Sequence, residues 1–194
     1  MKKIIFNDRY GLTQAVIDGR KTMTRLLINP EPKGELLSVV KECDGVVSAF
    51  FSYGDHVKAR YKIGEIVAVA QSYESFADNA IHGYDKVQCM VDSVGWSNKV
   101  FVIGDWMPHQ IRITDIRCEK LQDISNMEYA REGIYKTAVE NERGEIVPAY
   151  TYQNCHFNYN SPRAAFRDLI TELYGPFTWG NNPYVWAYEF ELVK

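Results

Sequence analysis

The sequence has few of the features that a metal site, a disulfide framework or a membrane segment requires. Its four cysteines lie far apart with no C-x-x-C pair, and its four histidines are equally scattered. This spacing excludes the usual zinc motifs and favours reduced thiols. The apolar run near the N-terminus covers only Ile4 to Phe6, and no later segment reaches membrane-spanning length. We therefore expect a cytoplasmic protein with no metal, no cofactor and no membrane partner.

Several common catalytic signatures are also missing. The chain has no glycine-rich phosphate loop, no H-E-x-x-H and no Ser-His-Asp signature. Cys155 lies next to His156, but adjacent side chains on an extended chain point to opposite faces, which disfavours a nucleophilic pair. The net charge of -3 does not favour nonspecific coating of nucleic acid, although it leaves room for a local basic pocket.

What is present is the composition of an ordinary globular domain. Hydrophobic residues make up 46% of the 194 positions and aromatic residues 13%, which is enough for a sizeable core. The length favours one domain over residues 1–194. Strand patterns and helix patterns alternate irregularly and no repeat is visible, so we predict an α+β fold around a small β-barrel with short flanking helices.

Periodicity and turn residues place the individual elements. We expect strands over 2–6, 66–70, 86–94, 98–104, 109–116 and 183–193, and a β-hairpin within 36–61 that turns near "ECDG". We expect helices over 7–19, 125–133 and 161–175, with Asp8 as the first N-cap, Ser125 and Glu128 as a capping box, and Ser161 as the last N-cap. Residues 135–160 have little period of either kind and are expected to form a loop with some hairpin content.

The stretch "DGRKTMTRLL" (18–27) gathers donors and cations directly behind the first expected helix. Lys21, Thr24 and Arg25 could converge on a phosphate, a carboxylate or a carbonyl group, with Lys as a point charge and Arg as a planar fork. The alternative is a solvated connection, because surface loops are commonly charged.

Polar residues also follow the buried strand 66–70. Gln71, Ser72, Tyr73 and Glu74 lie where this strand leaves the core, which is a place where side chains can be held rigidly beside a pocket. Glu74 is a candidate general base if it faces inward, and an ordinary exposed carboxylate if it does not.

Aromatic and amide residues crowd the C-terminal stretch "FTWGNNPYVWAYEF". Trp179 and Asn182 could stack on a nucleobase and read its edge, as in the recognition of single-stranded nucleic acid. An aromatic stripe of period two is more often part of a core, and we favour that interpretation for the strand that ends the chain.

Five segments taken in order resemble one family. They are "DGRKTMTR", "YKIGEIVAVAQSY", "MPHQIRITDIRCEKLQDIS", "AREGI" and "AFRDLITELYGPFTWGNNPYVWAYEFELV". Their succession is similar to that of the ASCH-domain proteins of bacteriophages and prophages, in the PUA-like superfamily. The resemblance implies a small β-barrel flanked by helices, a cleft for RNA or a nucleotide-like ligand, and family-variable insertions near 30–58 and 136–158.

The resemblance also implies roles for single residues. The family marker Gly-x-Lys-x-x-(Glu or Thr)-x-Arg matches Gly19, Lys21 and Thr24, while Leu26 occupies the final Arg position. Phage members commonly carry Arg-Glu-Thr-Trp where this chain has residues 70–73, so Gln71 replaces the glutamate. Related amidohydrolases that deacetylate N4-acetylcytidine are thought to combine a Lys, a Thr and a Glu, which points to Lys21 and Thr24 with Glu74 as a substitute carboxylate.

Three functions remain open at this stage. The leading hypothesis is a binding module for RNA or a modified nucleoside or nucleotide, with ligand contacts from Lys21, Thr24, Arg25, Gln71, Ser72, Tyr73, Arg112, Trp179 and Asn182. The second is an amidohydrolase acting on acylated nucleosides, with catalytic residues Lys21, Thr24 and Glu74. The third is a phage-encoded protein-interaction module, which would carry a large exposed apolar patch. We favour binding because replacement of a carboxylate by an amide removes proton transfer and leaves hydrogen-bond recognition intact.

Overall fold

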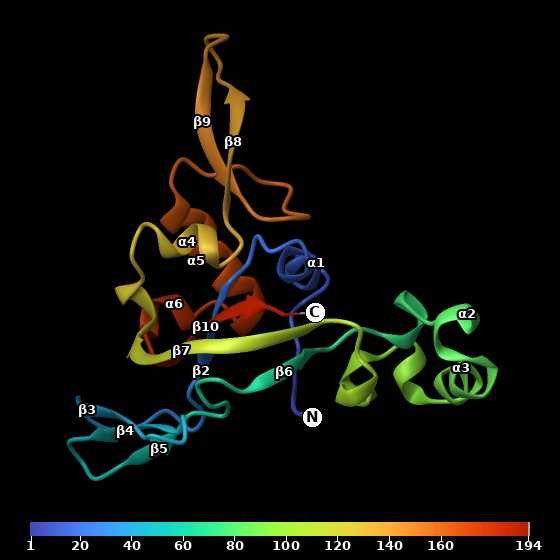
Figure 1. Cartoon of the computed structure of the whole chain (residues 1–194). Helices are drawn as coiled ribbons and strands as arrows, with labels where there is room; N and C mark the ends of the chain where they lie inside the picture. Colours follow the sequence, from blue (N-terminus) through green and yellow to red (C-terminus); the bar gives the residue numbers. More distant parts are fainter. Residues whose placement is uncertain (194) are drawn as a thin grey trace.

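The computed structural model describes residues 1–193, except for the side chain of Asn79. The fold is built on one five-stranded sheet (Figure 1). In spatial order its strands are β1 (Lys3–Ile4), β6 (Ile66–Val69), β7 (Gln110–Lys120), β10 (Tyr184–Leu192) and β2 (Met23–Leu27). β1 runs parallel to β6, and the other neighbouring strands are antiparallel. The sheet thus joins segments from both ends of the chain, which supports the predicted α+β class.

The predicted closed barrel does not form among the described strands, because β1 and β2 remain the two edges of an open sheet. Near each of these edges, a side chain donates a hydrogen bond to a backbone carbonyl group with which a further strand would otherwise pair. The Tyr174 hydroxyl donates to the carbonyl of Arg25 in β2 at 3.1 Å. The Lys99 ammonium donates to the carbonyl of Phe6, directly beyond β1. The coarser prediction of mixed helices and strands is confirmed, and the barrel is replaced by a sheet with capped edges.

Two further sheets form from the segments that the resemblance marked as insertions. The first contains β3 (Leu36–Lys41), β4 (Val47–Phe51) and β5 (His56–Lys58), and its first turn lies at "ECDG" as predicted. The second is the hairpin of β8 (Tyr135–Glu140) and β9 (Ile146–Thr151), which projects from the body of the molecule (Figure 1). The hairpin content predicted for residues 135–160 is thus confirmed, and it covers 135–151.

The predicted helices are present, with shorter bounds at the first two. They are α1 (Leu12–Ile17), α4 (Glu128–Arg131) and α5 (Pro162–Tyr174), followed by the additional single turn α6 (Thr178–Asn181). The Ser161 hydroxyl caps α5 by accepting the Ala164 N–H at 3.2 Å, as predicted. Asp8 is not the N-cap of α1, because Gly11 occupies that position in a left-handed conformation. Only half of the expected capping box forms at α4, where the Glu128 carboxylate accepts the Ser125 N–H.

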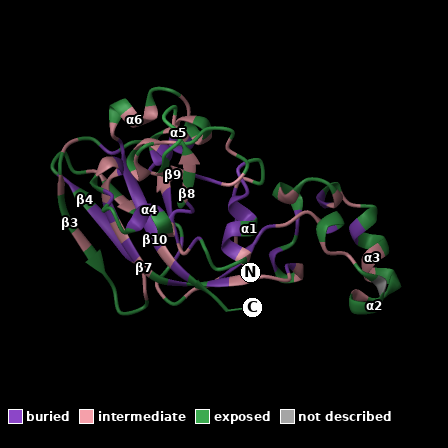
Figure 2. Ribbon diagram, turned by 90° about the horizontal axis from the view of Figure 1, so that it is seen from above, coloured by how far each residue is buried: buried purple, intermediate pink, exposed green. Residues whose placement is uncertain are grey.

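The strands predicted over 86–94 and 98–104 are wrong. This region forms the helices α2 (Asn79–His82) and α3 (Tyr84–Val91) and the 3-10 turns η2 (Val94–Trp96), η3 (Lys99–Phe101) and η4 (Gly104–Trp106). A strand would bury alternate residues, but Cys89 and Val91 are exposed while Val87 and Met90, three positions apart, face inward. Met90 packs with Tyr73 and Met107 in a small core of its own. Figure 2 shows how exposed the remainder of α2 and α3 is.

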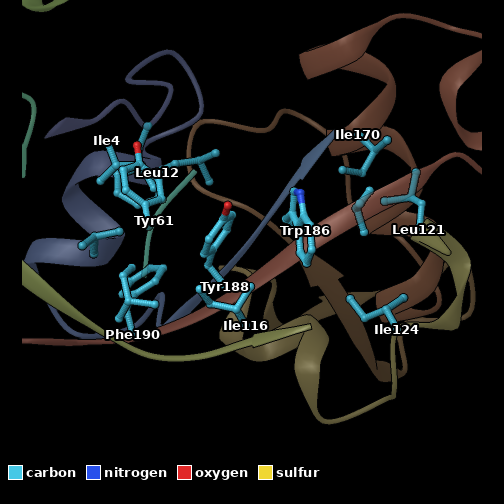
Figure 3. Close-up of a cluster of buried hydrophobic side chains, with 14 of the residues drawn as sticks. Ile4, Leu12, Tyr61, Ile116, Leu121, Ile124, Ile170, Trp186, Tyr188 and Phe190 are labelled. Atoms are coloured by element: carbon cyan, nitrogen blue, oxygen red, sulfur yellow. The ribbon is translucent and has the colours of Figure 1, made fainter. Parts of the chain in front are cut away.

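The main core lies between the central sheet and the helices (Figure 3). Ile111, Ile113 and Ile116 of β7 are all fully buried, although their spacing breaks strict alternation. A β-bulge opposite the Glu189–Phe190 step restores the inward direction at Ile116. Trp186 and Tyr188 of β10 are buried in the same core, which confirms that the C-terminal aromatic stripe is a core strand. Within residues 1–193, no helix combines the length and apolarity that a membrane crossing requires.

Candidate functional site

The basic residues predicted for a ligand site are instead buried in a charge network. The Lys21 ammonium donates to the Glu132 carboxylate at 2.7 Å and to the Glu132 backbone carbonyl at 2.8 Å. Arg25 donates to the other oxygen of the same carboxylate at 2.8 Å. The side chains of Lys21 and Arg25 are 2% and 0% exposed, so neither cation reaches solvent.

The charge network extends across one face of the central sheet and is covered by α4. Arg25 also donates to Glu119 at 2.6 Å and to Glu128 at 2.9 Å. Arg117 pairs with Glu128, and Arg131 donates to Glu189 at 2.9 Å. The charge network is thus composed of four cations and four carboxylates, which balance one another: Lys21, Arg25, Arg117, Arg131, Glu119, Glu128, Glu132 and Glu189.

Burial and pairing act on these groups in opposite directions. Burial alone would raise the pKa of Glu128, but hydrogen bonds from Arg117 and the Ser125 N–H, with the charge of Arg25, lower that pKa to about 2. Burial lowers the pKa of Lys21, and the Glu132 carboxylate opposes that shift. Buried charges of this kind persist only when they are paired. The charge network therefore has a structural explanation that needs no ligand.

Thr24 lies on the opposite face of β2 from Arg25. Side chains alternate along a strand, and Arg25 contacts Met23 on the network side at 3.2 Å. Thr24 is opposite Tyr188 in the register of β10 and lines a hollow of about 410 Å³ together with Lys99 and Tyr174. Lys21 and Thr24, which the amidohydrolase hypothesis requires to act together, thus project to different sides of the sheet.

Gln71 and Ser72 line a different hollow, which we call the polar cleft. It has a volume of about 320 Å³ and lies between α1, the exit of β6 and the loop after β9. Eight of its ten lining residues carry polar side chains. The lining comprises Asp8, Gly11, Thr13, Gln14, Ile17, Gln71, Ser72, Ser75, Gln153 and Asn154.

Four amide side chains in the polar cleft each use one end in a hydrogen bond within the protein. The Gln71 carbonyl oxygen lies 2.7 Å from His109 Nδ1, and the Gln153 carbonyl oxygen accepts from Arg20 at 2.9 Å. Burial lowers the pKa of His109. Because the Gln71 oxygen can only accept, His109 Nδ1 is the donor in this bond. These two bonds leave the NH₂ groups of Gln71 and Gln153 as donors for a ligand.

The other two amides offer acceptors in place of donors. The Gln14 NH₂ group donates to Asp18 at 2.7 Å, and the Asn154 NH₂ group donates to the Arg9 carbonyl at 3.2 Å. Their side-chain carbonyl oxygens remain to accept. The four amides of the polar cleft therefore have two free donor groups and two free acceptor groups, and each side chain is held at its other end by one hydrogen bond. Gln71 and Gln153 are half-buried, whereas Gln14 and Asn154 are exposed.

Gly11 allows this arrangement because Gln153 lies against its α-carbon. A Cβ atom at Gly11 would approach the Gln153 side chain to 2.5–2.7 Å, and the φ of Gly11 is +63°. Both the space and the backbone conformation require glycine at this position. Glycine at the N-cap of α1 therefore lets Gln153, in the loop after β9, lie against this end of the helix and line the polar cleft.

The remaining predicted site residues lie outside the polar cleft, and most of them are held by contacts within the protein. Tyr73 is buried and its hydroxyl accepts the Ile103 N–H, while Glu74 is exposed in the turn η1 (Tyr73–Ser75). Arg112 forms an exposed ion pair with Glu191. Trp179 packs under Arg163, and Asn182 accepts the Gln122 N–H at 2.8 Å.

Sequence reasoning missed most of the polar cleft. Gln14 lies on the short helix α1, which the spacing of its apolar residues predicts. The polar residues of this helix form no motif that would mark Gln14 as a site residue. Gln153 and Asn154 lie in a segment without period, so nothing in the sequence linked them to Gln71. The tertiary structure is what brings these amides together.

Comparisons of the chain with protein-family models, with curated proteins and with solved structures find no match.

Proposed function

We propose that the protein binds a nucleoside through the polar cleft. The observation that carries the proposal is the set of four amides, Gln14, Gln71, Gln153 and Asn154, which line one hollow with donors and acceptors fixed by hydrogen bonds behind them. The resemblance to ASCH-domain proteins supports the same ligand class, since that family is associated with RNA and nucleotide-like ligands.

The hydrogen-bonding pattern suits the edge of a nucleobase. A base edge presents donors and acceptors side by side, and proteins read it with amide side chains and hydroxyl groups. Gln71 and Gln153 supply donors, Gln14 and Asn154 supply acceptors, and Ser72 supplies a hydroxyl group. A volume of about 320 Å³ lies at the lower end of the range for small-molecule sites, which favours one nucleoside over a larger ligand.

The charges favour a neutral ligand within the polar cleft. Asp8 is the one charged residue among the ten that line it, and it forms an ion pair with Lys99 at 2.7 Å. Lys21 and Arg25 are occupied by carboxylates in the charge network, so they cannot neutralise a phosphate group. We therefore expect the base and sugar to determine binding in this cleft, with no gain from a phosphate placed inside it.

Calorimetric titration with cytidine, uridine, adenosine and guanosine tests the proposal. We expect at least one nucleoside to bind, and we expect the isosteric variant Gln71→Glu to weaken that binding about tenfold or more, as expected for a lost buried hydrogen bond. This variant keeps the acceptor for His109 and replaces the NH₂ donor with an oxygen.

Glu74→Gln is the matched control, because Glu74 is exposed outside the lining of the polar cleft. Its affinity for the same nucleoside should equal that of the wild type. Failure of all four nucleosides to bind at millimolar concentration would overturn the proposal, as would equal affinity of Gln71→Glu and wild type.

A further inference from the structure

A second and larger cavity lies beside the polar cleft, between α4, the start of α5 and the β8–β9 hairpin. Its volume is about 630 Å³, and we call it the tyrosine cavity. It is lined by Arg20, Asn126, Tyr129, Ala130, Gly133, Ile134, Tyr135, Lys136, Tyr150 and Pro162. None of these residues belongs to the polar cleft, and none was predicted from the sequence as a ligand contact.

Three tyrosines give this cavity its aromatic character. Tyr129 is almost completely buried, whereas Tyr135 and Tyr150 keep part of their surface exposed. Among the described residues, neither Tyr135 nor Tyr150 packs against another aromatic ring. Tyr150 is half-buried and packs in part against the main core, so the exposed part of its ring is what a planar group can reach, and aromatic side chains of this kind stack on nucleobases.

The charged residues in the lining of the tyrosine cavity are both cations. Lys136 is directly opposite Tyr150 in the β8–β9 ladder, so the two side chains share a face of the hairpin. Within the described part of the chain, no carboxylate lies within ion-pair distance of Lys136. Arg20 pairs with Asp18 at the surface, where both side chains remain about 40% exposed. This combination suits an aromatic ligand that carries negative charge.

One hydrogen bond connects the two hollows. Arg20 lines the tyrosine cavity and donates to Gln153 at 2.9 Å, and Gln153 lines the polar cleft. A ligand that occupies both hollows would pass Arg20 at the boundary. Across this surface the amides of the polar cleft are thus followed by the Arg20 guanidinium group and then by the tyrosines and the Lys136 ammonium group of the tyrosine cavity.

We infer that the tyrosine cavity is a second subsite, which takes the next nucleotide of a single-stranded nucleic acid whose first nucleoside occupies the polar cleft. The inference rests on the proposed function. Tyr150 contacts the second base, and Arg20 and Lys136 face the phosphate between the two nucleosides. The natural ligand is then an oligonucleotide of at least two residues.

Titration with cytidylyl-(3′→5′)-cytidine beside cytidine tests this subsite. We expect the dinucleotide to bind about tenfold more tightly, as one stacked base predicts, and to weaken with added NaCl while cytidine does not. Tyr150→Leu and Lys136→Ala should each remove most of this advantage and leave the affinity for cytidine unchanged. Adenosine and adenylyl-(3′→5′)-adenosine replace these probes if the polar cleft prefers adenosine.

Lys33→Ala is the matched lysine control, because Lys33 is exposed and outside both linings. It should keep the full advantage of the dinucleotide. Nucleoside binding with no tighter binding of the dinucleotide would overturn the subsite and leave the proposed function standing. If neither probe binds, the proposed function fails, and the subsite fails with it.

Discussion

Lys21 donates to Glu132 twice, to its carboxylate at 2.7 Å and to its backbone carbonyl at 2.8 Å. Both side chains are almost completely buried. The lysine that resembles a family site residue is therefore used to neutralise the carboxylate at the end of α4. Because of this pairing Lys21 belongs to the charge network and not to the polar cleft, where we propose that the ligand binds.

The first prediction concerns the stability that this pair provides. Lys21→Met leaves the Glu132 carboxylate with one fewer cation in a buried site, and removal of one partner of a buried pair costs about 3–5 kcal/mol. Urea denaturation should show this loss. The double variant Lys21→Met/Glu132→Gln should recover part of it, because a neutral amide no longer needs the second cation.

Arg20 provides the comparison for this measurement. It follows Gly19 in the same segment, but its ion pair with Asp18 is exposed. Arg20→Met should cost less than about 1 kcal/mol, as is usual for surface pairs. Equal losses in Lys21→Met and Arg20→Met would contradict the structural role of the charge network.

The second prediction concerns the pH dependence of stability. The Glu128 pKa is lowered from 4.5 to about 2 in the folded protein. A depressed carboxylate pKa stabilises the folded state above the unfolded value, and that contribution is lost as the pH falls from about 4.5 towards 2. For Glu128 the contribution is on the order of 3 kcal/mol.

The free energy of unfolding of Glu128→Gln and of the wild type should be compared from pH 7 to pH 3. The two values should differ most between pH 5 and pH 7, and by pH 3 their difference should have fallen by roughly half. A difference that stays constant over this range would show that Glu128 is not held ionised by Arg117 and Arg25.

Much of the fold follows from local patterns in the sequence. The α5 helix has a cap at Ser161, a proline in its first turn and an apolar stripe, all of which agree with one another. The buried strand β6 and the aromatic strand β10 are equally clear, because the sequence pattern of each predicts a strand and both are largely buried. Where propensity, pattern and turn residues agree, the element is predictable.

The errors arise where tertiary contacts decide. The apolar residues between 86 and 104 suit a strand by composition, but the segment forms a helix and turns in which Met90 and Val102 pack with Tyr73 and Met107. Most of its other apolar side chains are exposed. The sheet stays open with β1 and β2 as its edges, and at the β2 edge the Tyr174 hydroxyl donates to the carbonyl of Arg25, a contact between residues 149 positions apart. For the same reason Gln71 and Ser72 could be predicted as site residues from the sequence and Gln153 could not. The position of Gln153 beside them depends on a long loop and on the space that Gly11 leaves.

The third prediction separates binding from amide hydrolysis. Thr24 lies on the face of β2 opposite Arg25, Lys21 is bound to Glu132, and Glu74 is exposed in η1. We therefore expect no release of acetate from N4-acetylcytidine, even at high protein concentration over hours. Acetate release that is lost in Thr24→Ala would contradict this expectation and restore the amidohydrolase hypothesis.

The central claim is that the amides of the polar cleft bind the nucleoside, and side-chain NMR tests it most directly. In a protein labelled with ¹⁵N, a nucleoside that binds should shift the NH₂ signals of Gln71 and Gln153 and leave the Nε signal of Arg25 unchanged. Shifts confined to Arg25, or binding without any change at Gln71 and Gln153, would contradict the claim.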